Sequence, residues 1–393
     1  MKIADVVTTV VGTPWRELTF LELVTDDGRR GTAEVRMVNK TDTLLACVAE
    51  LAQRHVIGLD PCDRELLAFR IQRADYSRAG EVTQSALAAF DVACWDLVGQ
   101  ELGVPVWKLL GGCYRERVRA YANGWYQAER NPEAFAACAR EVVARGYRAL
   151  KLDPFGAANV DLSAAERRRA LELVAAVREA VGPDVQLMIE MHGRLSPGAA
   201  ATVAAELEQF DPAWIEEPVG SDSPTGLGRV RSATRSPIAT GERMHLLGDF
   251  RAVIEQGLAD ILQADLTHFG GLTGLRRLAG WAEAYELPLA PHNVCGPVGT
   301  AANVHFAVAT PNVLIVEHFN DFADAWVSEL VDDAPWVDPA DGCFGLPAKP
   351  GLGVHLDQDA CARRPRTHSR LFLFDEGWER RGVETPTGRS AEG

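Results

Sequence analysis

The sequence lacks several features that would place it in other protein classes. It has no apolar run near the roughly 20 residues needed to cross a bilayer. Residues 1–7 carry an acid and lack the long apolar core of a signal peptide. The eight cysteines contain no Cys-x-x-Cys pair, so they indicate neither a zinc site nor a disulfide scaffold. We therefore expect a cytoplasmic protein with no membrane partner.

Positive charge is also scarce. The 55 Asp and Glu residues outnumber the 40 Lys and Arg residues, which gives a net charge of −15. Because nucleic-acid binding requires basic residues clustered on one face, we expect no nucleic-acid partner. A small anionic substrate is compatible with this charge, since a bound metal can make its site locally positive.

The first part of the chain has the pattern of a small α+β domain. Residues 3–11, 20–25 and 31–35 alternate as antiparallel strands, and helical periodicity follows at 43–54 and 81–102. We place this domain at residues 1–115.

From residue 117, short apolar segments alternate with amphipathic segments. The predicted strands are 118–122, 149–152, 185–191, 214–217, 238–241, 261–264, 287–291 and 314–317, and helices are predicted at 132–145, 164–181, 198–209 and 271–285. This order predicts a parallel (β/α) barrel with its active site at the C-terminal strand ends. We place the barrel at 116–345 and a C-terminal segment at 346–393, with a loose polar end from about residue 376.

Three glutamates, Glu190, Glu216 and Glu242, stand at the ends of three successive predicted strands. In a barrel they would converge, and their hard oxygen ligands suit Mg²⁺. Any one strand-end glutamate is better explained by a surface salt bridge. The three together, in register with nearby histidines, favour a metal site.

The remaining polar strand ends supply acids, bases and one cation. His192 and His292 follow strands three and seven, and Asp265 can fix the tautomer of His292. Removal of a proton next to a carboxylate creates an enediolate, which Lys151 could stabilise together with the metal. Alternatively, Lys151 pairs with Asp153 or with a buried glutamate.

The chain resembles the mandelate racemase branch of the enolase superfamily. The motifs that carry the resemblance are Trp95-Asp96-Leu97, Leu109-Leu110-Gly111-Gly112, Glu216-Glu217-Pro218, Gly241-Glu242, the Asp265 and His292 pair, Glu317, and Pro350-Gly351-Leu352-Gly353. The resemblance implies a modified (β/α)₇β barrel, an N-terminal capping domain completed by the C-terminal segment, and a homo-oligomer. It also implies one Mg²⁺ per subunit on Glu190, Glu216 and Glu242, and a small carboxylate substrate that Glu317 contacts.

Two positions depart from the racemase pattern. The racemases carry Lys-x-Lys on strand two, whereas here Asp153 takes the second position, which disfavours two-base racemisation. The first metal ligand, commonly Asp, is Glu190 here. The sequence His192-Gly193-Arg194 is instead similar to that of galactonate dehydratase and related sugar-acid dehydratases.

The predicted reaction is a β-elimination from a sugar acid such as an aldonate. His292, oriented by Asp265, removes the C2 proton, and His192 protonates the departing 3-hydroxyl to give a 2-keto-3-deoxy acid. Substrate stereochemistry could exchange the roles of the two histidines.

Substrate binding is assigned to residues around this centre. Lys151 and Glu317 hold the carboxylate, Arg194 supports the leaving-group side, and Trp15 and Arg16 in the early loop set specificity. An epimerase, racemase or lactone cycloisomerase acting through the same enediolate is the alternative enzyme. A catalytically silent metabolite-binding homologue is the alternative outside catalysis.

Overall fold

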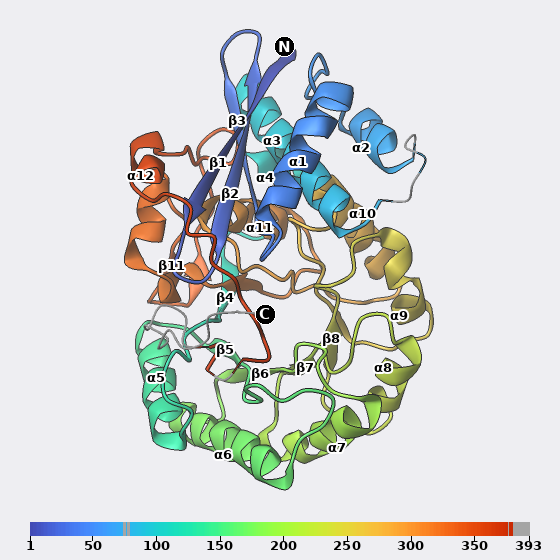
Figure 1. The fold of residues 1–393 in the computed structure, drawn as a ribbon, viewed down its shortest axis with the longest axis vertical. Coiled ribbons are helices and arrows are strands. Elements are labelled where there is room, and N and C mark those ends of the chain that lie inside the picture. Colours follow the sequence, from blue (N-terminus) through green and yellow to red (C-terminus); the bar gives the residue numbers. More distant parts are fainter. Residues whose placement is uncertain (74–75, 77–78, 376, 380–393) are drawn as a thin grey trace, which may run out of the picture.

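The computed structural model describes residues 1–73, 76, 79–375 and 377–379. An antiparallel sheet and several helices occupy one end of the molecule, and a ring of strands surrounded by helices occupies the other (Figure 1). The sheet consists of β1 (Ile3–Gly12), β2 (Glu17–Thr25) and β3 (Arg30–Val35) in that order. The three predicted strands are confirmed with ends shifted by a few residues.

Helices cover this sheet and connect it to the barrel. They are α1 (Thr41–Leu51), which continues as a π-helical turn at Ala52–Val56, α2 (Arg64–Gln72), α3 (Glu81–Leu102) and the short α4 (Val106–Leu110). α3 is buried on all sides over most of its length. A helix that is apolar all round lies inside a protein, and α3 packs against both β3 of the cap and α10 (Gly271–Glu283) of the barrel.

Six parallel strands form most of the barrel in sequence order. They are β4 (Val118–Ala122), β5 (Ala149–Leu152), β6 (Gln186–Glu190), β7 (Trp214–Glu216), β8 (Ile238–Thr240) and β9 (Ile261–Leu262), and β10 (Val316–His318) pairs with β4. Between β9 and β10, Leu289 forms parallel bridges to Leu262 and Val313. The ring of strands is therefore continuous.

The predicted strand at 287–291 is the weakest part of this ring. Pro288 and Pro291 flank the bridge at Leu289 and have no amide hydrogen to donate to a neighbouring strand. The chain here is extended but is not a regular strand. The last predicted strand, 314–317, lies at 316–318 in the structure.

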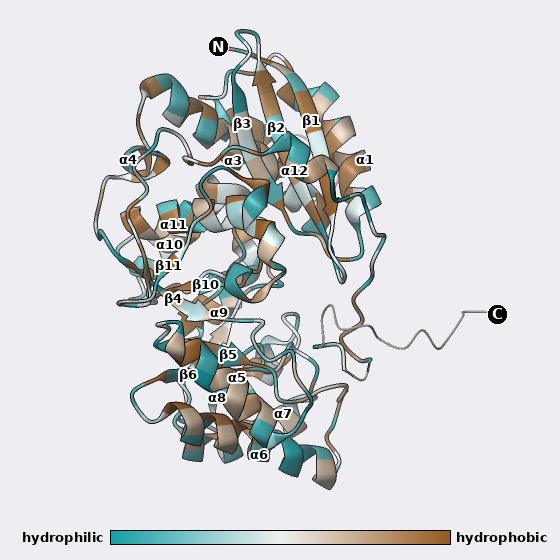
Figure 2. Cartoon of the chain, turned by 90° about the vertical axis from the view of Figure 1, so that its left-hand side faces the viewer, coloured by the Kyte–Doolittle hydropathy of each residue, from teal (hydrophilic) through white to brown (hydrophobic). Residues whose placement is uncertain are grey.

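Helices surround the ring, and several begin at clear capping residues. They are α5 (Pro132–Ala144), α6 (Ala164–Val181), α7 (Pro197–Leu207), α8 (Pro224–Arg231), α9 (Arg251–Glu255), α10 and α11 (Pro297–Ala309). Asn131 and Ser196 each accept a hydrogen bond from their helix, and Ser163 forms a capping box with Glu166. The helices carry both hydrophobic and hydrophilic segments, as amphipathic barrel helices should (Figure 2).

The C-terminal segment returns to the cap, as predicted. In this segment, α12 (Gln358–Ala362) lies beside β1 (Figure 1). Just before it, at the end of the barrel region, β12 (Cys343–Phe344) pairs with β4 and with β11 (Val337–Asp338). The end predicted to be loose from about residue 376 lies largely outside the described residues. Trp378 and Glu379 are described, and both are buried. Among the described residues, no helix is long and apolar enough to span a membrane.

Candidate active site

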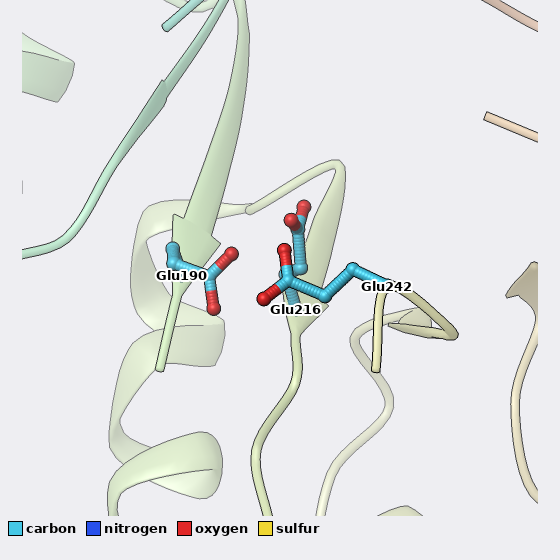
Figure 3. Close-up of side chains that lie close together, drawn as sticks. All are labelled: Glu190, Glu216 and Glu242. Carbon is cyan, nitrogen blue, oxygen red and sulfur yellow. The ribbon is translucent and has the colours of Figure 1, made fainter. Parts of the chain in front are cut away.

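Three glutamate side chains meet at the C-terminal ends of adjacent barrel strands. Glu190 ends β6, Glu216 ends β7, and Glu242 follows β8. One carboxylate oxygen from each lies within 4.8 Å of those of the other two. Figure 3 shows the three carboxylates turned toward one another. The structure thus brings together the set that the sequence singled out.

The electrostatics of this cluster suit a divalent cation. Burial and the charge of Glu216 raise the pKa of Glu190 well above its ordinary value. Burial also raises the pKa of Glu216, but the charge of Lys151 and the hydrogen bond with Glu190 together lower it below its ordinary value. For Glu242, the summed charges of Arg243, His292 and His192 outweigh burial and lower the pKa. Several carboxylates confined in a buried space repel one another, and a hard cation on their oxygens would remove that repulsion.

Lys151 lies at the centre of the negative charge. Its ammonium group contacts Glu216, and lies 3.0 Å from Glu317 Oε1 and 3.5 Å from Glu190 Oε2. The sequence leaves open whether Lys151 stabilises an enediolate or pairs with a nearby acid. The structure shows the pairing, and the partners are buried glutamates.

Glu317 on β10 is held rigidly. Asn123 Nδ2 donates to Glu317 Oε1 at 2.7 Å, and the Asn293 amide donates to Oε2 at 2.9 Å. In the glutamate cluster, Trp214 Nε1 and Gln263 Nε2 each donate to Glu216 Oε2 at 2.8 Å. Sequence reasoning missed these four donors, because uncharged polar residues in strands carry no distinctive pattern.

His292 and Asp265 form the predicted pair. His292 Nδ1 lies 2.7 Å from Asp265 Oδ2, and its Nε2 lies 3.0 Å from Glu242 Oε2. Asp265 also accepts hydrogen bonds from the Thr267 amide and hydroxyl. Burial lowers the pKa of His292, but the charges of Glu242 and Glu317 and the Asp265 hydrogen bond raise it above its ordinary value.

His192 also pairs with an aspartate, Asp153, and the sequence reasoning did not assign this partner to it. Its Nδ1 lies 2.5 Å from Asp153 Oδ2, and Arg194 contacts the same oxygen. Burial lowers the pKa of His192 and so makes its protonated form a stronger acid. The sequence did contain a signal that Asp153 faces the site. Lys151 and Asp153 are two residues apart at a strand end, so their side chains lie on the same face.

The early loop between β1 and β2 reaches the barrel. The Trp15 ring centroid lies 5.6 Å from that of Phe319, just after β10, and the Arg16 guanidinium donates to the carbonyl of Val294, near His292. Arg16 is buried. The structure therefore places both predicted specificity residues at the strand-seven and strand-eight side of the site.

A cap over a (β/α) barrel, with three converging glutamates and an Asp–His pair at the strand ends, defines the enolase type of enzyme. Comparison with known proteins agrees. Residues 3–111 match the mandelate racemase / muconate lactonizing enzyme N-terminal domain, and residues 134–360 match the enolase C-terminal domain-like family. The chain belongs to the mandelate racemase / muconate lactonizing enzyme family of this superfamily, which confirms the predicted family and fold.

Similar proteins of known name and structure cover nearly the whole chain. D-gluconate dehydratase of Thermoproteus tenax is 38% identical over 373 residues, which cover 94% of this chain and 74% of that protein. D-galactonate dehydratase of Klebsiella pneumoniae is 35% identical, with 91% and 93% covered. The crystal structure of a mandelate racemase/muconate lactonizing enzyme from Jannaschia sp. CCS1 superposes with a TM-score of 0.86 at 31% identity, covering 93% and 98%.

Proposed function

We propose that this protein is a metal-dependent sugar-acid dehydratase that converts an aldonate into a 2-keto-3-deoxy acid. The observation that carries the proposal is the placement of two Asp-paired histidines beside one cluster of three glutamates. One histidine can take a proton while the other gives one, as loss of water requires. Relatives named as gluconate and galactonate dehydratases support this reaction class and point to an aldonate substrate.

The proposed metal site consists of Glu190, Glu216 and Glu242. Their all-oxygen donor set favours Mg²⁺, one per subunit. When bound, the cation supplies positive charge that stabilises the enediolate form of the substrate.

His292 is the proposed base. Because its Nδ1 is bound to Asp265, its Nε2 is the nitrogen that accepts the C2 proton. Lys151 donates to the substrate carboxylate and so opposes the negative charge that develops there. Glu317, held by Asn123 and Asn293, fixes the other side of that carboxylate.

His192 is the proposed acid, and Arg194 supports the leaving-group side. His192 gives its proton to the 3-hydroxyl as the C3–O bond breaks. Asp153, where racemases carry a second lysine, contacts His192 and Arg194 and so leaves no lysine base on this strand. This difference favours elimination over racemisation.

Several assignments outside this centre stay predictions. They are the specificity role of Trp15 and Arg16, the domain boundaries near residues 115 and 345, homo-oligomeric assembly, and the cytoplasmic location. The position of Trp15 and Arg16 against the barrel supports the first.

The test is incubation of the purified protein with Mg²⁺ and single aldonates or aldarates in D₂O, followed by NMR. We expect loss of the C2 proton signal and a new C3 methylene. Deuterium at C2 without loss of water would instead identify an isomerase. No change with any acid, together with no bound metal, would identify a silent homologue.

A further inference from the structure

Asp153 is more firmly held than a simple counter-ion requires. It follows β5, its side chain is fully buried, and both of its carboxylate oxygens are engaged. Oδ1 accepts from the Phe155 amide at 2.8 Å, and Oδ2 accepts from His192 Nδ1 at 2.5 Å and from Arg194. The carboxylate is thus fixed in position independently of the His192 ring.

This contact decides which nitrogen of His192 can transfer a proton. A carboxylate only accepts hydrogen bonds, so Nδ1 carries the hydrogen and Nε2 is the reactive nitrogen. The His192 backbone lies in the left-handed region with φ 49°, and its amide donates to Glu190 Oε1 at 2.5 Å. These contacts place the residue, while Asp153 sets the rotation of the ring.

The site therefore contains two aspartate–histidine pairs. His292 and Asp265 follow the strands beyond β8, whereas Asp153 and His192 follow β5 and β6. The strands that carry the three glutamates, β6 to β8, lie between β5 and β9 in the sheet. Each pair presents a histidine with a fixed tautomer to the same centre from a different side.

We propose that Asp153 is a positioning residue that aims His192 at the leaving group, so that each proton transfer has its own aspartate–histidine pair. The inference rests on the proposed dehydratase function. The C2–H bond breaks, its proton goes to His292 Nε2, and its electron pair becomes the C2–C3 double bond of an enol. The C3–O bond breaks, and the departing oxygen keeps that bond's electron pair and takes the proton from His192 Nε2 to leave as water.

The competing explanation is that Asp153 only neutralises Arg194. Arg194 is buried, and it also contacts the Gly156 carbonyl. Under that explanation, any carboxylate at position 153 suffices, and its loss disturbs the site for every substrate alike. Under the positioning proposal, the loss of Asp153 lowers turnover only in reactions whose leaving group must be protonated.

A substrate with fluoride in place of the 3-hydroxyl separates the two, because fluoride leaves as an anion and hydroxide needs a proton. Turnover of an aldonate accepted by the wild type and of its 3-deoxy-3-fluoro analogue is measured for Asp153→Asn, Asp153→Glu and the exposed control Asp161→Asn. We expect both position-153 variants to lose about 10- to 100-fold in water elimination, the scale known for carboxylates that orient a metal-bound histidine. Fluoride release should change less than about threefold, and Asp161→Asn should match the wild type.

An equal loss with both substrates, or full rescue by Asp153→Glu, would overturn the positioning role in favour of charge neutralisation. Asp153→Glu keeps the negative charge beside Arg194, so the comparison holds even where Asp153→Asn fails to fold. A wild-type protein that releases neither water nor fluoride from any aldonate would overturn the dehydratase function itself and this inference with it.

Discussion

At the scale of single residues, the two histidines differ in the charged groups that surround them. His292 Nε2 lies against Glu242, and its Nδ1 against Asp265. His192 instead shares Asp153 with an arginine. Burial, aided by the charge of Arg194, lowers the pKa of His192 despite Asp153, whereas Glu242, Glu317 and Asp265 raise that of His292, which agrees with an acid at His192 and a base at His292.

The base assignment is tested by His292→Asn. The amide keeps a polar group beside Asp265 but cannot accept the C2 proton, so we expect turnover to fall by at least about 10²-fold. Thermal unfolding and Mg²⁺ binding should stay near wild type, since Asn adds no bulk and its amide can replace Nδ1 as the donor to Asp265. NMR in D₂O reports C2 deuteration directly, and deuteration at the wild-type rate would remove His292 from the base position.

Residue identity and spacing were enough to predict that the three glutamates, both histidines, Asp265 and Lys151 lie together at the strand ends. They were not enough to find partners whose role depends on side-chain direction. Asp153 was noticed as a departure from a lysine motif and as a candidate partner of Lys151, not of His192, and Asn123 and Gln263 were not singled out. Such residues become visible only when the barrel closes and brings distant strand ends together.

At the scale of elements, α3 connects three parts of the chain through a buried aspartate. Asp96 Oδ2 accepts from the Thr32 amide of β3 at 2.8 Å, and Oδ1 accepts from the Leu352 amide of the C-terminal segment at 2.7 Å. A Cβ on Gly351, where φ is +69°, would lie 2.1 Å from Asp96 Oδ1. This close approach explains why position 351 requires a glycine, and it brings two motifs that are far apart in the sequence into contact.

Asp96→Ala should therefore be strongly destabilising. Two buried amides lose their acceptor, and each unsatisfied group costs about 1–3 kcal/mol. We expect the free energy of unfolding in urea to fall by about 2–5 kcal/mol. Asp184→Ala, in an exposed loop, is the control and should change little. A loss below about 0.5 kcal/mol for Asp96→Ala, the range of ordinary surface changes, would contradict the connecting role.

The raised pKa of Asp96 predicts that the free energy of unfolding depends on pH. Burial raises the pKa of Asp96 to about 6 in the folded protein, whereas an unfolded aspartate has a pKa of about 3.9. Between these values the unfolded chain releases its proton first, so the contribution of Asp96 to stability is greatest below about pH 4 and is lost as the pH rises past about 6. Relative to Asp96→Asn, the wild type should lose up to about 3 kcal/mol across that window. Parallel pH profiles of unfolding for the two proteins would contradict this.

The C-terminal end supplies a second element-scale prediction. The Trp378 ring centroid lies 5.4 Å from the His192 ring, edge to face, and Trp378 Nε1 donates to the Gly156 carbonyl at 3.1 Å. Glu379 pairs with Arg130 at 3.1 Å. Deletion of residues 377–393 removes this support and should lower kcat by up to about 10²-fold, because small displacements of a catalytic group are costly. Deletion of residues 380–393 keeps Trp378 and is the matched control; equal kcat values for the two truncations would exclude the support.

Element order was predictable because barrel helices and strands differ in hydrophobic period. In the structure, only a bridge at Leu289 is found where a strand was predicted at 287–291, because Pro288 and Pro291 have no amide hydrogen to donate. The buried place of Trp378 was not predictable, because it depends on a contact with a loop more than 180 residues earlier in the sequence.

At the scale of the whole molecule, the cap and the barrel share the site. Arg36, just after β3, lies 3.8 Å from Asp265, and Glu34 accepts from the amides of Gly296 and Gly299 at the start of α11. The cap therefore contacts Asp265, which orients the base, through Arg36. Its own loop between β1 and β2 carries Trp15 and Arg16 to the barrel. Changes in the cap should reach the chemistry through these contacts.

The glutamate cluster links metal binding to the stability of the whole fold. Its buried carboxylates repel one another, and a cation that binds only the folded state stabilises it by about 2.7 kcal/mol at 100 times its Kd. For a chain of this size, we expect saturating Mg²⁺ to raise the Tm by several degrees. Glu216→Gln should lose most of this rise, and the exposed control Glu172→Gln should keep it. Differential scanning calorimetry with and without Mg²⁺ measures the shift, and an undiminished rise in Glu216→Gln would remove Glu216 from the ligand set.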